Sequence, residues 1–98
     1  MTNPTYVNRP VSVEKEAVHD LKFPDEDVLI SKDAIKARTA NLERALKLGN
    51  LEHYKIKIVF EDAEGLKQVE TTVWGVTDKR VILKQGALIP IHRIHEVI

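Results

Sequence analysis

The pattern of hydrophobic and polar residues changes its period near residue 53. From there to the end of the chain, apolar residues recur at every second position in short runs rich in Val, Ile and Thr, which is typical of strands with one buried face. Ile56, Ile58 and Phe60 show the alternation most clearly. The pattern predicts five consecutive strands, over residues 55–61, 66–76, 81–84, 87–91 and 94–98.

Turn residues between these runs predict how the strands connect. Residues 62–65 fit a type I turn that ends in Gly65 and joins the first two strands as a hairpin. Gly75, inside the long second strand, indicates the sharp bend or bulge that a small barrel needs in order to close. Pro90 cannot donate a ladder hydrogen bond, so the fourth strand should end there or lie at an edge. Residues 92–93 fit one tight turn before the last strand.

An amphipathic helix is predicted before the strands, over residues 32–48. Ser31 is a good N-cap, and Ile30 and Ile35 have the spacing of a hydrophobic staple. Gly49 is placed to end the helix in a left-handed conformation. The apolar stripe consists of Ala34, Ile35, Leu42, Ala45 and Leu46. The opposite face is polar and mostly basic, with Lys36, Arg38, Asn41, Glu43, Arg44 and Lys47. That face is either solvated or a surface for phosphate or an acidic partner.

Residues 1–30 precede this helix as an acidic and largely irregular arm. They contain three of the four prolines and three basic residues against six acidic ones, whereas residues 31–49 carry five basic against two acidic. A short helix over residues 13–21, capped by Ser12, is compatible with the pattern. The apolar residues 28–30 should dock the arm on the rest of the chain.

Together these elements predict an α+β fold that is mainly β. One amphipathic helix is followed by a five-stranded, strongly bent antiparallel barrel, and residues 31–98 form this helix-plus-barrel domain. The length of 98 residues leaves room for one ordinary domain.

The predicted barrel resembles the Sm-like branch of the SH3-like small barrels. Its closing run, residues 89–98, is a strand, a one-turn break and an Ile-x-x-Ile ending, similar to the ending of WYL-type and YolD-like domains. Trp74 is followed by Gly75 and Val76 where WYL domains have Tyr and Leu, and no RNA-binding signature of Sm or Hfq proteins is present. The chain is also similar to a set of short bacterial proteins. The resemblance implies a frame that binds RNA, DNA, peptides or further copies, and it implies no chemistry.

Composition narrows the class of protein. The net charge is zero, so no overall field draws the chain to nucleic acid or to an anionic membrane. The chain is 43% hydrophobic, and no apolar run approaches the roughly 18 residues of a spanning helix. The absence of cysteine fits a reducing compartment, and the first residues lack the basic and apolar regions of a secretion signal. We therefore expect a cytoplasmic protein with no membrane partner.

Residues that carry enzyme chemistry are missing or already assigned to structure. Of the two serines, one lies in the arm and the other caps the helix, so neither is placed as a nucleophile. His92 and His95, with His53 or Glu96, could gather a metal only if a turn brought the imidazoles together. No glycine-rich phosphate loop is present. We expect a non-catalytic protein with no cofactor, no metal and no small-molecule ligand.

Two sets of residues remain as candidates for binding. Trp74 is the only tryptophan, and we expect it to pack beneath the helix or beneath residues 28–30, with an exposed stacking platform as the alternative. The basic candidates are Lys36 and Arg44 on the helix, with Lys79, Arg80, Lys84 and Arg93 at the barrel rim. We expect a protein-protein or self-association module, because a partner or a second copy would cover the exposed strand edges of a short barrel. A nucleic-acid-binding regulator, using RNA or DNA contacts from the basic residues, is the alternative.

Overall fold

The computed structural model describes residues 9–98 and has an α+β fold, as the sequence predicts. Within these residues one long helix, α1, runs over Lys32–Glu52. The first eight residues of the predicted arm lie outside the described part of the chain. The strands are β1 (Val11–Ser12), β2 (Ile56–Glu61), β3 (Leu66–Thr71), β4 (Val73–Val76), β5 (Arg80–Leu83), β6 (Leu88–Pro90) and β7 (Ile94–Val97). Short 3₁₀ helices connect them, namely η1 (Lys15–Asp20), η2 (Lys84–Gly86) and η3 (Ile91–Arg93).

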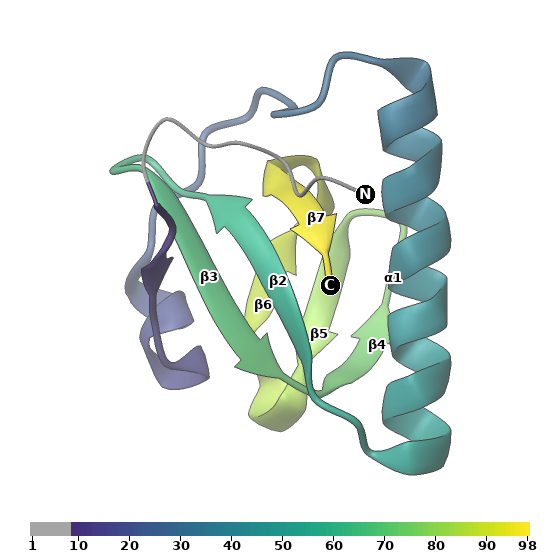
Figure 1. Ribbon diagram of the computed structural model, residues 1–98. Helices are drawn as coiled ribbons and strands as arrows, with labels where there is room; N and C mark the ends of the chain where they lie inside the picture. The colour runs from purple at the N-terminus through teal and green to yellow at the C-terminus, as the bar shows by residue number, and fades with distance from the viewer. Residues whose placement is uncertain (1–8) are drawn as a thin grey trace.

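The strands form two sheets (Figure 1). Sheet A has the order β1-β3-β2-β7, and sheet B has the order β4-β5-β6. The second strand that the sequence predicts, residues 66–76, passes from one sheet to the other and is interrupted at Thr72. The pairing of β4 with β5 shifts its register between Val73 and Gly75, which confirms the predicted irregularity at Gly75. The predicted β2–β3 hairpin forms, and the tight turn predicted at residues 92–93 is present as the 3₁₀ helix η3.

Both sheets are open in the described chain. Strand pairing does not continue from β6 to β7, so the single closed five-stranded ladder expected from the sequence is not formed. Pro90 has no N–H, and η3 takes the backbone out of the extended conformation between these strands. Helices cover the sides where the sheets meet. α1 packs against β4 and β7, and η1 packs against β3 and β6.

The core lies between the inward faces of the two sheets. Ile56, Ile58 and Phe60 of β2 are buried, as their alternation predicts. Val59 is buried as well, so the second face of β2 is not solvated at that point. The rest of the core comes from η1, α1 and the other strands: Val18, Leu42, Ala45, Val69, Val73, Val81, Leu83, Ala87, Ile89 and Ile94.

Helix α1 begins where the sequence predicts. The Ser31 hydroxyl accepts a hydrogen bond from the Ala34 backbone N–H at 3.2 Å, which satisfies one of the free donors of the first turn. The predicted hydrophobic staple is wrong, because Ile30 is 96% exposed and cannot be packed on the first turn. Within residues 9–98, no helix is both long and apolar enough to cross a bilayer.

The end of α1 differs from the prediction. The helix continues through Gly49 to Glu52, and the left-handed residue that ends it is His53, with φ 57°. Gly49 is buried against β4, where a Cβ atom would collide with the carbonyl oxygen of Val73. The glycine therefore serves the close approach of helix and strand rather than the cap.

The predicted short helix over residues 13–21 is present as the 3₁₀ helix η1. Its one buried side chain is Val18, which enters the core. Ser12 does not cap it, because the Ser12 hydroxyl instead accepts a hydrogen bond from the side chain of Gln68 at 2.8 Å. Ser12 lies in β1, which pairs in parallel with β3.

Residues 21–30, here called the strap, connect η1 to α1. The rings of Phe23 and Phe60 lie 6.1 Å apart in a tilted arrangement. Further along, the Val28 N–H donates to the His92 carbonyl at 2.9 Å. The strap therefore docks on β2 and η3. The expectation that residues 28–30 dock it holds only in part, because Val28 and Leu29 are half-buried whereas Ile30 is exposed.

Candidate functional site

A cleft of about 930 Å³ lies beside β6. One side is formed by η1 and the strap, and the other by the β4–β5 turn, β6 and η3, with Arg38 of α1 also contributing. No other element of the described chain pairs with the outer edge of β6, which is the last strand of sheet B. The cleft is thus an open space next to an edge strand.

The pairing of β6 with β5 decides which backbone groups face the cleft. The Leu83 N–H donates to the Ala87 carbonyl at 2.8 Å, and the Ile91 N–H donates to the Lys79 carbonyl at 2.9 Å. Backbone groups alternate in direction along a strand, so residues 87, 89 and 91 face β5. Leu88 therefore directs both its N–H and its C=O away from β5. Among residues 9–98, neither group has a hydrogen-bond partner.

The side chains along this edge also alternate. Val81 and Ile89 are paired across the strands and are fully buried in the core. Leu88 points to the opposite face and is 43% exposed, although it is apolar. Arg80 is paired with Pro90 and so lies on the same outer face as Leu88. An exposed apolar side chain on β6 and a cationic side chain on the neighbouring strand β5 thus share this face.

A compact turn fixes the position of Arg80. The Thr77 hydroxyl accepts hydrogen bonds from the backbone N–H groups of Lys79, at 3.2 Å, and Arg80, at 2.9 Å. The Thr77 N–H donates to the Arg80 carbonyl at 2.8 Å. The backbone at the start of β5, which carries Arg80, is therefore fixed beside the cleft.

Charged side chains around the cleft are mostly unpaired. Lys22, Lys79 and Arg80 form no ion pair within residues 9–98, and neither do Asp25 and Asp78. Three unpaired cations against two unpaired carboxylates make the cleft slightly basic in a chain of zero net charge.

Arg38 is paired at the side of the cleft and does not belong to the solvated face of α1. It is 5% exposed and binds both carboxylate oxygens of Asp27, at 2.9 and 2.8 Å, and the carbonyl of Ile94 at 3.1 Å. This pairing with the Arg38 guanidinium holds the pKa of Asp27 below its usual value, against the opposing effect of burial. The assignment of Arg38 to the basic outer face is therefore wrong.

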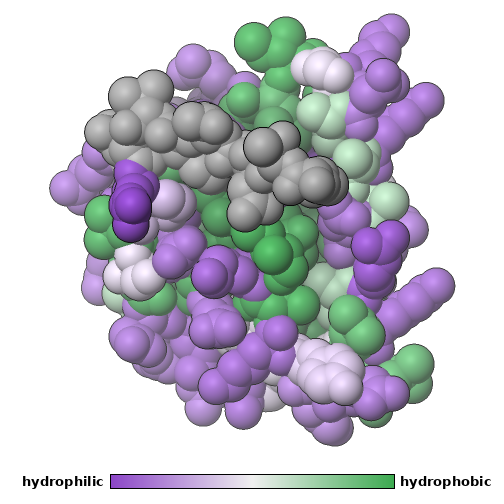
Figure 2. Space-filling model, viewed as in Figure 1, coloured by the Kyte–Doolittle hydropathy of each residue, from purple (hydrophilic) through white to green (hydrophobic). Residues whose placement is uncertain are grey.

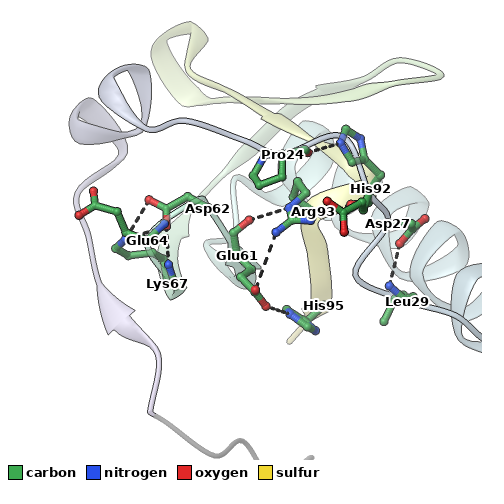
Figure 3. A network of polar contacts seen from close by, with 12 residues as sticks. Pro24, Asp27, Leu29, Glu61, Asp62, Glu64, Lys67, His92, Arg93 and His95 are labelled. Carbon is green, nitrogen blue, oxygen red and sulfur yellow. Dashed lines mark hydrogen bonds and ion pairs between the residues drawn. The ribbon is translucent and has the colours of Figure 1, made fainter.

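Arg93 is also buried, at 6% exposure, and the expected rim position is wrong. Figure 3 shows its contact with Glu61. Its Nε donates to the carbonyl of Glu61 at 3.0 Å and its Nη1 to the carbonyl of Glu26 at 2.7 Å. The Glu61 carboxylate also contacts His95 at 2.9 Å. Arg93 therefore ties the strap to β2 and cannot contact a phosphate in solution.

The histidines considered as metal ligands have other contacts. A ring nitrogen of His92 lies 2.9 Å from the carbonyl of Pro24, and His95 contacts Glu61 (Figure 3). Residues 9–98 hold no group of three or more His, Cys, Asp or Glu side chains placed to bind a metal ion.

Trp74 is 52% exposed, so the expected packing beneath the helix or the strap is wrong. It lies on β4 next to the interruption at Thr72. The backbone N–H of Lys84 donates to the Thr72 carbonyl at 2.9 Å, and the Thr72 hydroxyl lies 3.5 Å from the carbonyl of His53. Trp74 and Lys84 therefore occupy the corner where β4, η2 and the end of α1 meet.

The basic candidates do not form one surface. Lys79 and Arg80 line the cleft, whereas Lys84 lies at the corner near Trp74. Lys36 and Arg44 are exposed on the outer side of α1, where Figure 2 shows mostly hydrophilic side chains. With Arg93 buried, these positive charges are scattered over separate parts of the molecule.

Sequence reasoning missed the cleft and the role of the strap. One signal was available: Arg38 precedes Leu42 by four residues and Ala45 by seven, so the helical period places it on the apolar stripe. Nothing in the local sequence indicates that the strap would reach Arg93 or that η1 would border β6, because both contacts join segments far apart in the chain.

No family model, curated protein or solved structure matches the chain. The function is therefore inferred from the geometry.

Proposed function

We propose that this protein is a non-catalytic interaction module that binds an extended segment of a partner protein along β6. The observation that carries the proposal is the unpaired N–H and C=O of Leu88, which face an open cleft at the edge of a sheet. Edge strands bind extended peptides by adding them as a further strand, with main-chain hydrogen bonds for affinity and side-chain contacts for specificity.

We further propose that the chain is an SH3/Sm-like small barrel in which helices complete the wall. Three features support this class: the strand that passes from one sheet to the other at Thr72, the one-turn break η3, and the return of β7 to pair with β2. Frames of this kind bind peptides as well as nucleic acids, so the class is compatible with peptide binding and does not select it.

The distribution of charge favours a protein partner over nucleic acid. A phosphate backbone requires several cations along one track, and here they lie on the outer side of α1, at the Trp74 corner and in the cleft. A protein segment needs fewer charges, because the edge of β6 supplies main-chain contacts.

Nucleic-acid binding remains the second candidate, supported by the 52% exposure of Trp74 near Lys84. Trp74 is the only tryptophan, so its fluorescence reports on that corner alone. A single-stranded oligonucleotide should quench it in a salt-dependent way if this candidate is correct. Unchanged fluorescence at low salt, with no binding in a gel-shift assay, would exclude it.

The peptide proposal is tested by removing one N–H group. Leu88→Pro deletes the outward-facing donor and leaves the hydrogen bonds to β5 intact, because Leu88 makes none of them. The preceding residue, Ala87, has φ −64° and ψ 144°, a conformation that proline tolerates after it. Peptides selected from a random octapeptide display library on the full chain should bind Leu88→Pro about tenfold more weakly.

Leu88→Ala is the matched control, because it removes the same side chain and keeps the N–H. It should weaken binding less than Leu88→Pro, and circular dichroism should show both variants folded. Equal binding by the two variants would show that the main chain of β6 is not used. Failure of the library to yield any binder would contradict the proposed function itself.

A further inference from the structure

We infer that the segment bound by β6 carries an acidic residue two positions before an apolar residue and runs antiparallel to the strand. This inference rests on the proposed function and adds the sequence that the edge would select. It follows from which side chains share the outer face of sheet B and from how they are spaced along the edge.

The apolar position follows from Leu88. Leu88 is paired with Ile82 of β5, and both lie on the outer face, where Leu88 is 43% exposed and Ile82 is half-buried. In an added strand, the residue directly opposite Leu88 points to this same face. An apolar side chain there would cover the exposed part of Leu88 and gain from removing it from water.

The acidic position follows from Arg80. Arg80 is paired with Pro90, so the added residue opposite Pro90 lies on the same face as Arg80, two strands away. Neighbouring strands are about 4.8 Å apart, which puts about 10 Å between the two Cα atoms, a span that extended Arg and Glu side chains bridge. Arg80 has no ion pair within residues 9–98, so a carboxylate at this position would complement it.

The order of the two residues follows from strand direction. β6 runs from Leu88 to Pro90, so in an antiparallel partner the residue opposite Pro90 comes two positions before the residue opposite Leu88. Sheet B is antiparallel throughout, and antiparallel pairs are the commoner kind. The expected motif is therefore Asp or Glu, then any residue, then an apolar residue.

A second copy of this chain does not supply that motif through its own β6. A two-fold arrangement centred on Leu88 would place Leu88 opposite Leu88 and Gly86 opposite Pro90. Gly86 offers no carboxylate to Arg80. Self-pairing through β6 in this register thus leaves Arg80 without a carboxylate, and the occupant we propose is an acidic segment of a different protein.

The test is selection from a random octapeptide display library on the immobilised full chain, followed by affinity measurements with one synthetic peptide from the enriched set. We expect enrichment of the acidic-x-apolar order. Arg80→Glu should weaken binding of that peptide about fivefold, and the same selection repeated on Arg80→Glu should enrich Lys or Arg at the acidic position.

Arg44→Glu is the matched control, since Arg44 is an exposed arginine on the outer side of α1. It should change the affinity less than twofold. Enriched peptides with no acidic preference, or equal effects of the two variants, would overturn this inference while leaving the peptide-binding function in place. The reverse order, apolar before acidic, would overturn the antiparallel register. A dimer in sedimentation that Leu88→Pro dissociates would overturn the assignment to a different protein.

Discussion

At the scale of single residues, buried arginines organise this chain more than its exposed ones. Arg38 and Arg93 are each at most 6% exposed, and each joins a part of the strap to the sheets. The Nε of Arg38 has no hydrogen-bond partner within the described residues, so the Asp27 carboxylate and the Ile94 carbonyl carry the whole compensation for burying its charge.

Asp27→Asn should therefore destabilise the protein. Removing the carboxylate leaves the buried Arg38 guanidinium without its counter-charge, and we expect a loss of about 2 kcal/mol in the free energy of unfolding at pH 7, measured by urea denaturation. Asp25→Asn is the control, since Asp25 is exposed and forms no ion pair in residues 9–98, and it should change stability by less than about 0.5 kcal/mol. Equal stability of the two variants would show that the pair contributes nothing.

The same residue predicts a pH dependence. The pKa of Asp27 is lowered in the folded chain, chiefly by the Arg38 hydrogen bonds, so the folded state favours the charged carboxylate. Its contribution is complete above the usual pKa of an aspartate and is lost as the pH falls below about 4. The difference between the natural chain and Asp27→Asn should shrink between pH 5 and pH 2. A difference independent of pH would assign the effect to packing.

Asp62, at the hairpin between β2 and β3, also has a lowered pKa in the folded chain. Burial would raise its pKa, but hydrogen bonds from the Lys67 ammonium, at 2.8 and 2.9 Å, and from the backbone N–H groups of Glu64 and Gly65 outweigh burial and lower it (Figure 3). Asp62 therefore also stabilises the chain at neutral pH and less so in acid, at the hairpin between β2 and β3.

At the scale of elements, the decisive contact is the one between α1 and β4. Gly49 lets the helix approach the carbonyl of Val73 more closely than any other residue would permit. In an ordinary helix position, replacing glycine with alanine adds about 1 kcal/mol of stability. Here the added methyl group meets backbone, which cannot rotate away as a side chain can.

Gly49→Ala should therefore reverse the usual sign and lower the free energy of unfolding by about 2 kcal/mol, measured in urea. Asn50→Ala, one residue further along the exposed side of the helix, should leave stability unchanged or raise it by a few tenths of a kcal/mol. A stabilising Gly49→Ala would contradict the close packing of α1 on β4.

The elements themselves were largely predictable, and their contacts were not. Local patterns predicted the Ser31 cap, the strands after residue 53, a strand end or edge at Pro90 and a tight turn before the last strand. They misassigned Gly49 as a cap, because a glycine near the end of a helix fits both a cap and a close contact. Trp74 was expected to pack beneath the helix or residues 28–30, yet it is 52% exposed, which agrees with the alternative of an exposed platform.

At the scale of the whole molecule, two open sheets are connected where the chain passes from β3 to β4 at Thr72, and both α1 and η1 pack against strands of each sheet (Figure 1). This arrangement explains why the cleft could not be read from the sequence. One side of the cleft is formed by η1 and the strap, and the other side by the edge of β6. These two sides are about 65 residues apart in the chain. Pro90 predicted that the fourth strand would end there or lie at an edge, whereas the position of the segments that face β6 depends on tertiary packing alone.

The central claim is that the outward face of Leu88 is a vacant strand position that an acidic peptide fills. Amide hydrogen exchange measured by NMR tests it directly, with and without a peptide of the acidic-x-apolar order. The Leu88 amide should exchange freely in the unbound chain and at least about tenfold more slowly in the complex, while the Ile89 amide, which faces β5, is protected in both. A Leu88 amide whose exchange the peptide leaves unchanged, with the protection falling instead around Trp74, would contradict the account.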